Sequence, residues 1–296
     1  MQKKIYLIIA VVFISCATYL GKSDKLINYV DPFIGSGGHG HVFVGANVPF
    51  GGVQVGPTNF NKGWDWSSSY HHTDSIVKGF CHINVSGTGM SDLGELTIMP
   101  ATGKLMTGAG TQNNHMAGYS SLYYKDKEHA SVGYYKVHLE RYDIDVELTA
   151  TERVGLHKYR FPESDQSRII IDLGEGSADR PTETYLKKIN DTLFQGHRFS
   201  SGWARDQREY FSLIISKPVD DFILYDRHKK FKGEERKGDY VKGFLEFSTK
   251  SNENIMVKMG ISTVSSKNAL ENMMIELPHW DFSTVKKDAE KKWEKE

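Results

Sequence analysis

The residues with the clearest potential for chemistry lie in one glycine-rich segment, residues 29–100. Within it, Trp64 and Trp66 flank Asp65 in a loop that is rich in Gly and Ser. An indole can stack on the apolar face of a sugar ring, and a carboxylate beside it can accept hydrogen bonds from the sugar hydroxyls. The pattern therefore indicates a site for a neutral sugar, while one core and one surface tryptophan would give the same sequence.

Other polar side chains of this segment leave several possibilities open. Glycoside cleavage needs two carboxyl groups, one acid and one base or nucleophile, but spacing alone does not select a pair here. Histidines could bind a metal ion, but they lack a third ligand at a recognised spacing, so hydrogen bonds to the backbone or to sugar hydroxyls are the better interpretation. The carboxyl candidates are Asp65, Asp92 and Glu95, and the histidines are His39, His41, His71, His72 and His82.

The many glycines of the segment could suggest a phosphate-binding loop. No Gly-Lys-Ser or Gly-Lys-Thr follows them and no helical pattern begins there, so nucleotide binding is rejected. The chain has 37 Lys and Arg and 37 Asp and Glu residues. Because these charges balance, no overall field would concentrate the protein on nucleic acid or anionic lipid, and we expect a neutral partner.

The elements that must position these residues are mostly strands. Apolar residues alternate with polar ones in three segments, which places one face of each on a core. Three short, continuous apolar runs are typical of inner strands. The alternating segments are 135–139, 146–150 and 257–261, and the continuous runs are 169–171, 210–215 and 222–225. With turn residues between them, the pattern predicts a mainly β fold, a large antiparallel β-sandwich over residues 28–264.

Residues 265–296 have a helical pattern instead. Asn268 and Glu271 resemble a capping box, and the apolar residues that follow recur at helical spacing until Pro278. A second helix is predicted from about residue 283 and is still running at Glu296. Its apolar stripe of Val285, Ala289 and Trp293 is expected to be unpaired. The chain is therefore expected to be truncated, with residues 265–296 as a helical linker to a missing domain.

The N-terminus carries an export signal. Two lysines precede an apolar run at residues 5–14, which is short for a membrane span and typical of a secretory signal. The run ends at Cys16, which resembles the lipid-bearing cysteine of a lipoprotein signal, although a chance Cys in an ordinary signal would look similar. Residues 1–16 are thus predicted to be a signal peptide and residues 17–27 a tether. Only Cys81 remains afterwards, so no intramolecular disulfide is possible.

The sequence resembles glycoside hydrolase family 92, a family of exo-acting α-mannosidases. The resemblance runs from about residue 28 to the last residue and consists of many short motifs in order. The motifs are at residues 29–35, 37–41, 48–51, 63–65, 70–71, 86–89, 92–94, 147–151, 153–155, 202–204, 206–207 and 210–211. So many ordered motifs are far more specific than a single glycine pattern.

The resemblance implies an N-terminal β-sandwich of the galactose-mutarotase-like, carbohydrate-binding type, joined by helices to an (α/α)₆ barrel. It places the general-acid Glu, the general-base Asp and a bound calcium mainly in that barrel, so it implies no catalytic residue in this chain and no calcium bound by this chain alone. What it assigns to the sandwich is one wall of the sugar pocket. The implied substrate-binding residues are Phe50, Gly51 and Trp64, with Trp66 and His71 as further candidates.

The resemblance therefore predicts the sugar-site-completing N-terminal domain of a calcium-dependent inverting exo-α-mannosidase that acts on N-glycans or mannans. Its expected partners are a mannose-containing glycan and the missing C-terminal catalytic domain, with no nucleic acid and no membrane contact except through a lipid anchor. Export would make it a periplasmic or cell-surface lipoprotein of a Gram-negative bacterium. A stand-alone, lectin-like carbohydrate-binding protein and an inactive truncated remnant remain as alternatives.

Overall fold

The computed structural model describes residues 25–90, 92–176 and 179–296. The predicted signal peptide, with the lipidation candidate Cys16, lies outside the described residues, as does most of the tether. Met1–Val30 forms a unit of its own, whose described part is the 3-10 turn η1 (Leu26–Tyr29). Within the described parts of the chain, no helix is both long enough and apolar enough to cross a membrane.

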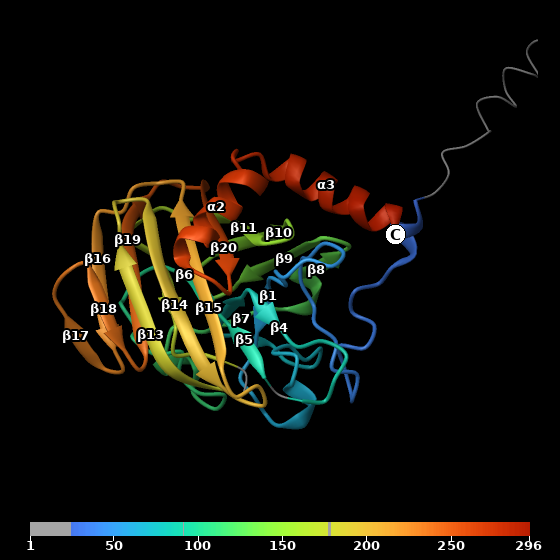
Figure 1. Ribbon diagram of the computed structural model, residues 1–296, viewed down its shortest axis with the longest axis horizontal. Helices are drawn as coiled ribbons and strands as arrows, with labels where there is room; N and C mark the ends of the chain where they lie inside the picture. Colours follow the sequence, from blue (N-terminus) through green and yellow to red (C-terminus); the bar gives the residue numbers. More distant parts are fainter. Residues whose placement is uncertain (1–24, 91, 177–178) are drawn as a thin grey trace, which may run out of the picture. The chain divides into compact units, whose positions relative to one another are not determined.

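Two antiparallel β-sheets make up most of residues 31–296 (Figure 1). In spatial order, the seven-stranded sheet consists of β1 (Gly56–Thr58), β3 (Gly79–Cys81), β6 (Thr97–Ala101), β12 (Ser164–Asp172), β19 (Val241–Thr249), β16 (Asp221–Asp226) and β17 (Lys229–Phe231). The nine-stranded sheet consists of β18 (Glu235–Gly238), β13 (Arg180–Lys188), β14 (Leu193–Ser201), β15 (Gln207–Ile215), β20 (Glu253–Ser262), β11 (Val154–Phe161), β10 (Ile144–Ala150), β9 (Tyr134–Leu139) and β8 (Glu128–Ser131).

Shorter elements lie in the connections. Two small ladders pair β2 (Ile76–Val77) with β7 (Ser121–Leu122) and β4 (Ile83–Asn84) with β5 (Leu93–Glu95). Three further 3-10 turns are η2 (Trp64–Trp66), η3 (His115–Ala117) and η4 (Lys125–Lys127). The predicted mainly β, antiparallel sandwich is therefore confirmed.

Apolar side chains between the two sheets form the core, as the alternation predicts. Alternate residues of β9, β10 and β20 are buried, among them Val137, Leu148 and Val257. Ile169–Ile171 are all buried because β12 lies near the middle of its sheet, between β6 and β19. The prediction that residues 222–225 form an inner strand is only partly correct. They lie in β16, next to the edge strand β17, and only Leu224 of the four is fully buried.

Helix α2 (Ser266–Glu276) begins one residue after Ser265, whose extended backbone lets its hydroxyl accept a hydrogen bond from the Asn268 amide at 3.1 Å. The predicted cap at Asn268 is therefore wrong by three residues, because Asn268 already lies inside the first turn. Its side-chain amide nitrogen still reaches Glu271 Oε2 at 3.4 Å. The sequence pattern finds the helix but places its cap one turn too late.

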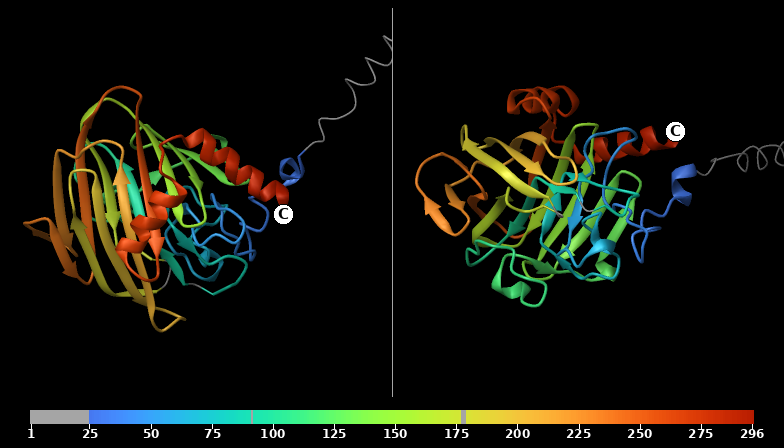
Figure 2. Two further views of the ribbon diagram at one scale, coloured as in Figure 1. Left: turned by 45° about the horizontal axis from the view of Figure 1, so that its top comes forward. Right: turned by 60° about the horizontal axis from the view of Figure 1, so that its bottom comes forward.

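Helix α3 (Phe282–Lys295) corrects a second expectation. Its apolar stripe is not unpaired, because Val285 and Ala289 are buried and the Trp293 indole donates to the Asn47 carbonyl at 2.8 Å. Both helices lie on the outer side of the nine-stranded sheet (Figure 1; Figure 2). There, Phe282 and Val285 join a second apolar cluster with Val154 and other outward residues of the sheet. The stripe thus packs on the sandwich that precedes it.

A chain of hydrogen bonds between side chains runs through the core. His157 lies on the inner face of β11, with its Nε2 2.8 Å from Nε2 of His82. His82 Nδ1 donates to the Leu96 carbonyl at 2.7 Å, and the Tyr159 hydroxyl donates to His157 Nδ1 at 2.8 Å. With these partners, each ring carries one proton and His157 is the donor to His82. Burial lowers the pKa of His82 to about 4 and that of His157 well below its usual range.

Replacing His157 by Phe should weaken the dependence of stability on pH. A histidine whose pKa is depressed by folding takes up its proton only in the unfolded chain, so the stability it contributes is complete above its unfolded pKa of 6.5 and is lost as the pH falls. Each such histidine adds a slope of about 1.4 kcal/mol per pH unit. Urea titrations between about pH 6 and pH 4.5 should show this slope reduced in His157→Phe. An unchanged slope would mean that His157 is charged in the folded protein.

Candidate functional site

The Trp64 indole is fixed in place but open to solvent. Gly63, with φ of 114°, turns the chain into η2, and the Trp64 Nε1 donates to the Gly89 carbonyl. The ring meets His41 edge-on at 4.2 Å between centroids and lies 5.4 Å from the His39 ring. A Cβ at Gly89 would come within 2.5 Å of the indole, so only glycine permits this approach. Trp64 is nevertheless 56% exposed.

Asp65, next to Trp64, forms an acceptor group with two histidines. Its Oδ1 is 2.6 Å from His39 Nδ1 and 3.7 Å from His41 Nε2. The hydrogen bond from His39 lowers the pKa of Asp65. An ionised carboxylate accepts hydrogen bonds and does not act as a general acid at neutral pH. The geometry therefore suits Asp65 to bind hydroxyl groups.

Trp66 and His71 form a second, more enclosed pair. Their rings stack at 4.2 Å with an interplanar angle of 23°, and Trp66 Nε1 donates to Asp74 Oδ2 at 3.0 Å. Lys62 closes the group with an ion pair to Asp74 at 2.8 Å. His71 is buried, and its Nδ1 is 2.9 Å from the Thr73 hydroxyl. These side chains have protein partners on several sides and are less open to a ligand than Trp64.

Phe50 and Gly51 lie on a different turn. The Gly51 amide donates to the Val48 carbonyl at 3.1 Å, and the following Gly52 amide donates to the Glu152 carbonyl at 2.7 Å, in the turn between β10 and β11. Phe50 is 95% exposed and has a left-handed φ of 58°. This conformation is uncommon for an aromatic residue and is often found at functional sites. The predicted residues thus fall into two groups, one on this turn and one around η2.

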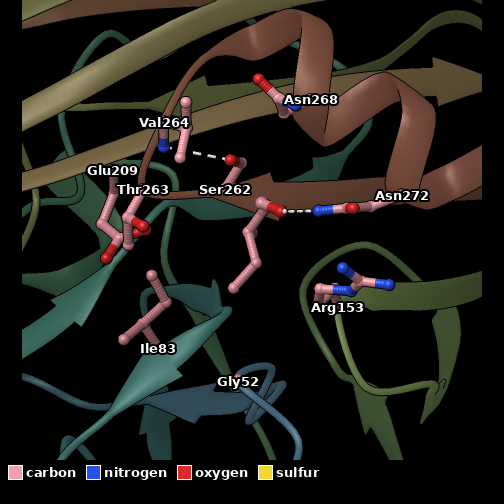
Figure 3. Close-up of a pocket in the computed structure, with 10 residues that line it drawn as sticks. Gly52, Ile83, Arg153, Glu209, Ser262, Thr263, Val264, Asn268 and Asn272 are labelled. Carbon is pink, nitrogen blue, oxygen red and sulfur yellow. Dashed lines mark hydrogen bonds between the residues drawn. The ribbon is translucent and has the colours of Figure 1, made fainter.

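A hollow of about 420 Å³ adjoins the Phe50–Gly51 turn, since Gly52 lines it (Figure 3). Glu209 of β15, Arg153 and two asparagines of α2 contribute polar groups, and Ile83 is part of the apolar wall. Burial raises the pKa of Glu209 to about 7. Glu209 is not among the residues that the sequence pattern indicates as a site. One feature of the sequence could have identified it. Glu209 is a charged residue at an inward position of a strand, two residues before Phe211, which lies in the core.

Glu95, one of the carboxyl candidates, belongs to a buried network. Its Oε1 accepts from the Ser200 hydroxyl at 2.7 Å and pairs with Arg198 Nη1 at 2.8 Å. The same nitrogen of Arg198 pairs with Asp179 at 2.5 Å. Burial raises the pKa of Glu95 to about 8, since it shares the one guanidinium with Asp179. Its contacts give Glu95 a structural role.

Asp92, a second carboxyl candidate, holds the turn that follows β14. Its Oδ2 accepts from Gln207 Nε2 at 2.8 Å and from the Ala204 amide at 3.2 Å. A Cβ at Gly202 would clash with Asp92 Oδ1, so the turn packs closely on this carboxylate. Trp203, between these contacts, is 75% exposed. It was not chosen as a site residue from the sequence, although its motif contributes to the family resemblance.

Residues 29–262 match the sequence model of the glycosyl hydrolase family 92 N-terminal domain. The chain belongs to this family. The GH92 α-mannosidase BT3965 from Bacteroides thetaiotaomicron has the same fold with a TM-score of 0.89 and 34% identity, over 92% of this chain and 37% of that one. The GH92 inverting mannosidase BT2199 from the same organism gives a TM-score of 0.79 at 22% identity, over 93% of this chain and 36% of that one, which shows the fold alone.

A curated relative of this GH92 chain comes from Arthroderma benhamiae and is described as an uncharacterized secreted glycosidase. It is 24% identical over 90% of this chain and 37% of its own length. A secreted relative is consistent with export of the GH92 chain. The chain spans about 37% of the length of BT3965 and of this glycosidase.

Metal binding by the GH92 chain finds no support in the geometry. In the segments that the structure describes, no group of three or more His, Cys, Asp and Glu side chains is arranged to hold an ion. His39 and His41 approach one carboxylate, that of Asp65, and His82 is committed to the buried chain with His157. His71 and His72 contact aromatic rings, those of Trp66 and Phe33.

Replacing Asp92 by Ala should loosen the Trp203 turn of the GH92 domain. Two hydrogen bonds to a buried carboxylate are lost and their donors are left without partners, at a cost of about 2–4 kcal/mol. Chemical denaturation should measure this loss, and hydrogen exchange at Ala204 should become faster. The matched control is Asp206→Ala on the same turn, whose exposed carboxylate pairs with the exposed Arg208 and should cost less than about 1 kcal/mol. Equal effects of the two substitutions would contradict the anchoring role of Asp92.

Proposed function

We propose that this chain provides the sugar-recognising N-terminal domain of a calcium-dependent, inverting exo-α-mannosidase that acts on N-glycans or mannans. The family match over residues 29–262 and the likeness to the mannosidase BT3965 support the proposal. One observation carries it: Trp64 is 56% exposed although Gly89 and two histidine rings fix its orientation. A rigid, exposed aromatic ring is suited to stacking on a sugar, because little side-chain entropy is lost on binding.

The proposal gives recognition and catalysis to different parts of the enzyme. Trp64 stacks on the glycan and the ionised Asp65 beside it accepts hydrogen bonds from hydroxyl groups. Phe50 and Gly51 supply a second contact from their own turn. Cleavage with inversion needs an acid and a base about 6.5–9.5 Å apart. We assign that pair to a C-terminal catalytic domain, because Asp92 and Glu95 are committed to structural contacts.

The family resemblance is the only basis for including calcium in the proposed function. The ion takes six to eight oxygen ligands, mostly from carboxylates, carbonyls and water. The described residues of this chain do not fit such a site, since no cluster of candidate ligands is present among them. We therefore expect the ion in the catalytic domain, and no step assigned to this chain depends on it.

We further propose that the protein is exported and anchored through Cys16 as a lipoprotein of a Gram-negative bacterium. The charged and apolar regions before Cys16 support this, together with the secreted relative. A lipid anchor at Cys16 would hold the protein at a membrane, either in the periplasm or on the cell surface.

A lectin-like protein is the second candidate function. The packing of α3 favours it, because Val285 and Ala289 are buried against the sandwich itself. Burial of this stripe within the chain is one feature that independent folding requires. Under this alternative, Trp64 and Asp65 bind glycan without any hydrolysis.

A domain exchange tests the proposed function. In a chimaera, residues 29–262 replace the corresponding domain of BT3965, and hydrolysis of an α-mannoside is measured with calcium. We expect the chimaera to be active and the 296-residue chain alone to be inactive. Trp64→Ala in the chimaera should lower kcat/KM about tenfold through loss of about 1.4 kcal/mol of stacking.

Tyr124→Ala, which removes a ring that is 51% exposed just before η4, is the control and should leave activity unchanged. A folded chimaera that is insensitive to Trp64→Ala would contradict the role of Trp64. Hydrolysis by the chain alone would contradict the placement of the catalytic pair. A folded but inactive chimaera, together with mannoside binding by the chain alone, would favour the lectin.

A further inference from the structure

Glu209 is a half-buried carboxyl group without a hydrogen-bonding or ion-pairing partner among the described residues. It occupies an inward position of β15, where the next two inward residues, Phe211 and Leu213, are fully buried in the core. Unlike Phe211 and Leu213, Glu209 is not enclosed by the core, and its side chain lines the hollow of about 420 Å³ that Gly52 also lines. Withdrawing a carboxyl group from water without a partner costs free energy. A ligand that hydrogen-bonds to Glu209 would offset that cost.

Polar groups from other elements line the same hollow (Figure 3). The Asn272 side chain uses its nitrogen to bond the Ile261 carbonyl at 2.9 Å, which leaves its amide oxygen as an acceptor. The Ser262 hydroxyl accepts from the Val264 amide at 3.0 Å and keeps its own proton to donate. Ile83 and Gly52 supply an apolar wall. The hollow thus combines acceptors, donors and an apolar surface over a short distance.

The charges around the hollow select a neutral ligand. Glu209 is the single acidic side chain in its lining, and a cation site would need several oxygen ligands. Arg153, the lining cation, pairs through its Nε with Glu276 at 2.5 Å, and this carboxylate offsets its charge. A wholly apolar ligand would leave the polar groups unsatisfied. A neutral ring that carries hydroxyl groups fits this combination best.

We propose that the Glu209 hollow is a subsite for one pyranose ring of the glycan, with Glu209 and Asn272 accepting hydrogen bonds from its hydroxyl groups. The class of ligand rests on the proposed function, while the site itself rests on the hollow and its lining. Gly52 lines the hollow and directly follows Gly51, so the subsite adjoins the Phe50–Gly51 turn. The subsite is distinct from the group of Trp64 and Asp65 around η2.

The charge of Glu209 provides a distinctive readout. Burial raises its pKa to about 7, and an ionised carboxylate is a stronger acceptor than a protonated one. Among the residues that line the hollow, the other charged group is Arg153, which precedes β11 and is paired with Glu276 of α2. The lining residues from β4, β20 and α2 are uncharged. Affinity for a neutral sugar should therefore increase as the pH rises through about 7.

The test uses the 296-residue chain and the probe sugars methyl α-mannoside and α-mannobiose, titrated by calorimetry between about pH 5.5 and 8.5. At high pH, Glu209→Ala should bind about tenfold more weakly than the wild type. Glu209→Gln should match the wild type at low pH but lack the increase in affinity at high pH. Glu163→Gln, on an exposed acid between β11 and β12, is the matched control and should retain the wild-type profile.

Thermal unfolding accompanies each titration. Since Glu209 has no partner to lose, Glu209→Gln should be at least as stable as the wild type. Thr263→Val, which removes another hydroxyl of the lining, serves as a second variant and should also weaken binding.

Wild-type affinity and pH profile in both Glu209 variants would overturn the subsite. So would an absence of mannoside binding by the wild-type chain, because the hollow is built entirely from its own residues. The chimaera assay decides the proposed function separately. Binding that Trp64→Ala abolishes but Glu209→Ala leaves intact would remove the subsite and leave the proposed function standing.

Discussion

One buried guanidinium holds together the elements that carry the site loops. Arg198 of β14 is fully buried; its Nε donates to the Leu173 carbonyl just after β12 at 3.0 Å, and its Nη1 lies between Glu95 and Asp179. A buried charge is tolerated only when it is paired and hydrogen-bonded. The seven-stranded sheet, the nine-stranded sheet and the short β4–β5 ladder must therefore meet at one point. The loop that supports Trp64 through Gly89 starts from this ladder.

Apolar surface is distributed unevenly between the helix-covered face and the turns. Both helices cover the outer side of the nine-stranded sheet and close an apolar cluster there. Among the exposed aromatic side chains of the described residues are Phe50, Trp64 and Trp203, which all lie on turns. Hydrogen bonds fix each of these turns: Gly51 to the Val48 carbonyl, Trp64 to the Gly89 carbonyl, and Ala204 to the Asp92 carboxylate. The rings are therefore exposed but lie on well-anchored turns. Rigid aromatic rings in solvent are a cost to a soluble domain and an advantage for one that binds sugars.

Much of the fold could be predicted from the sequence because its signals are local. Alternation with period two identifies the inward residues of β9, β10 and β20, and helical spacing identifies α2 and α3. The position of the α2 cap could not be predicted, since Ser265 and Asn268 are both good capping residues and only the backbone conformation distinguishes them. The burial of the α3 stripe could not be predicted either, because its partner Val154 lies far away in the sequence.

The candidate site shows the same limit. Trp64 and Asp65 could be identified because they are adjacent in a glycine-rich loop, but the stacking of Trp66 on His71 depends on how that loop folds back. Glu209 is one polar residue in an apolar strand, and the sequence does not reveal that Ile83 and the residues after β20 leave a hollow around it.

The protonation states of the carboxyl groups are consistent with the proposal that this domain binds glycan and a C-terminal domain cleaves it. Glycoside hydrolysis requires one carboxyl that gives up a proton and another, across the bond, that is ionised. Asp65 has a lowered pKa and is suited only to the ionised role. Burial raises the pKa of both Glu95 and Glu209, but Glu95 is enclosed with Arg198 and cannot reach a substrate. Glu209 is accessible, but it is the single acid of its hollow. Asp65 and Glu209 each supply one accessible carboxyl group, which is enough to accept a hydrogen bond from a hydroxyl group, as the proposal requires of this domain.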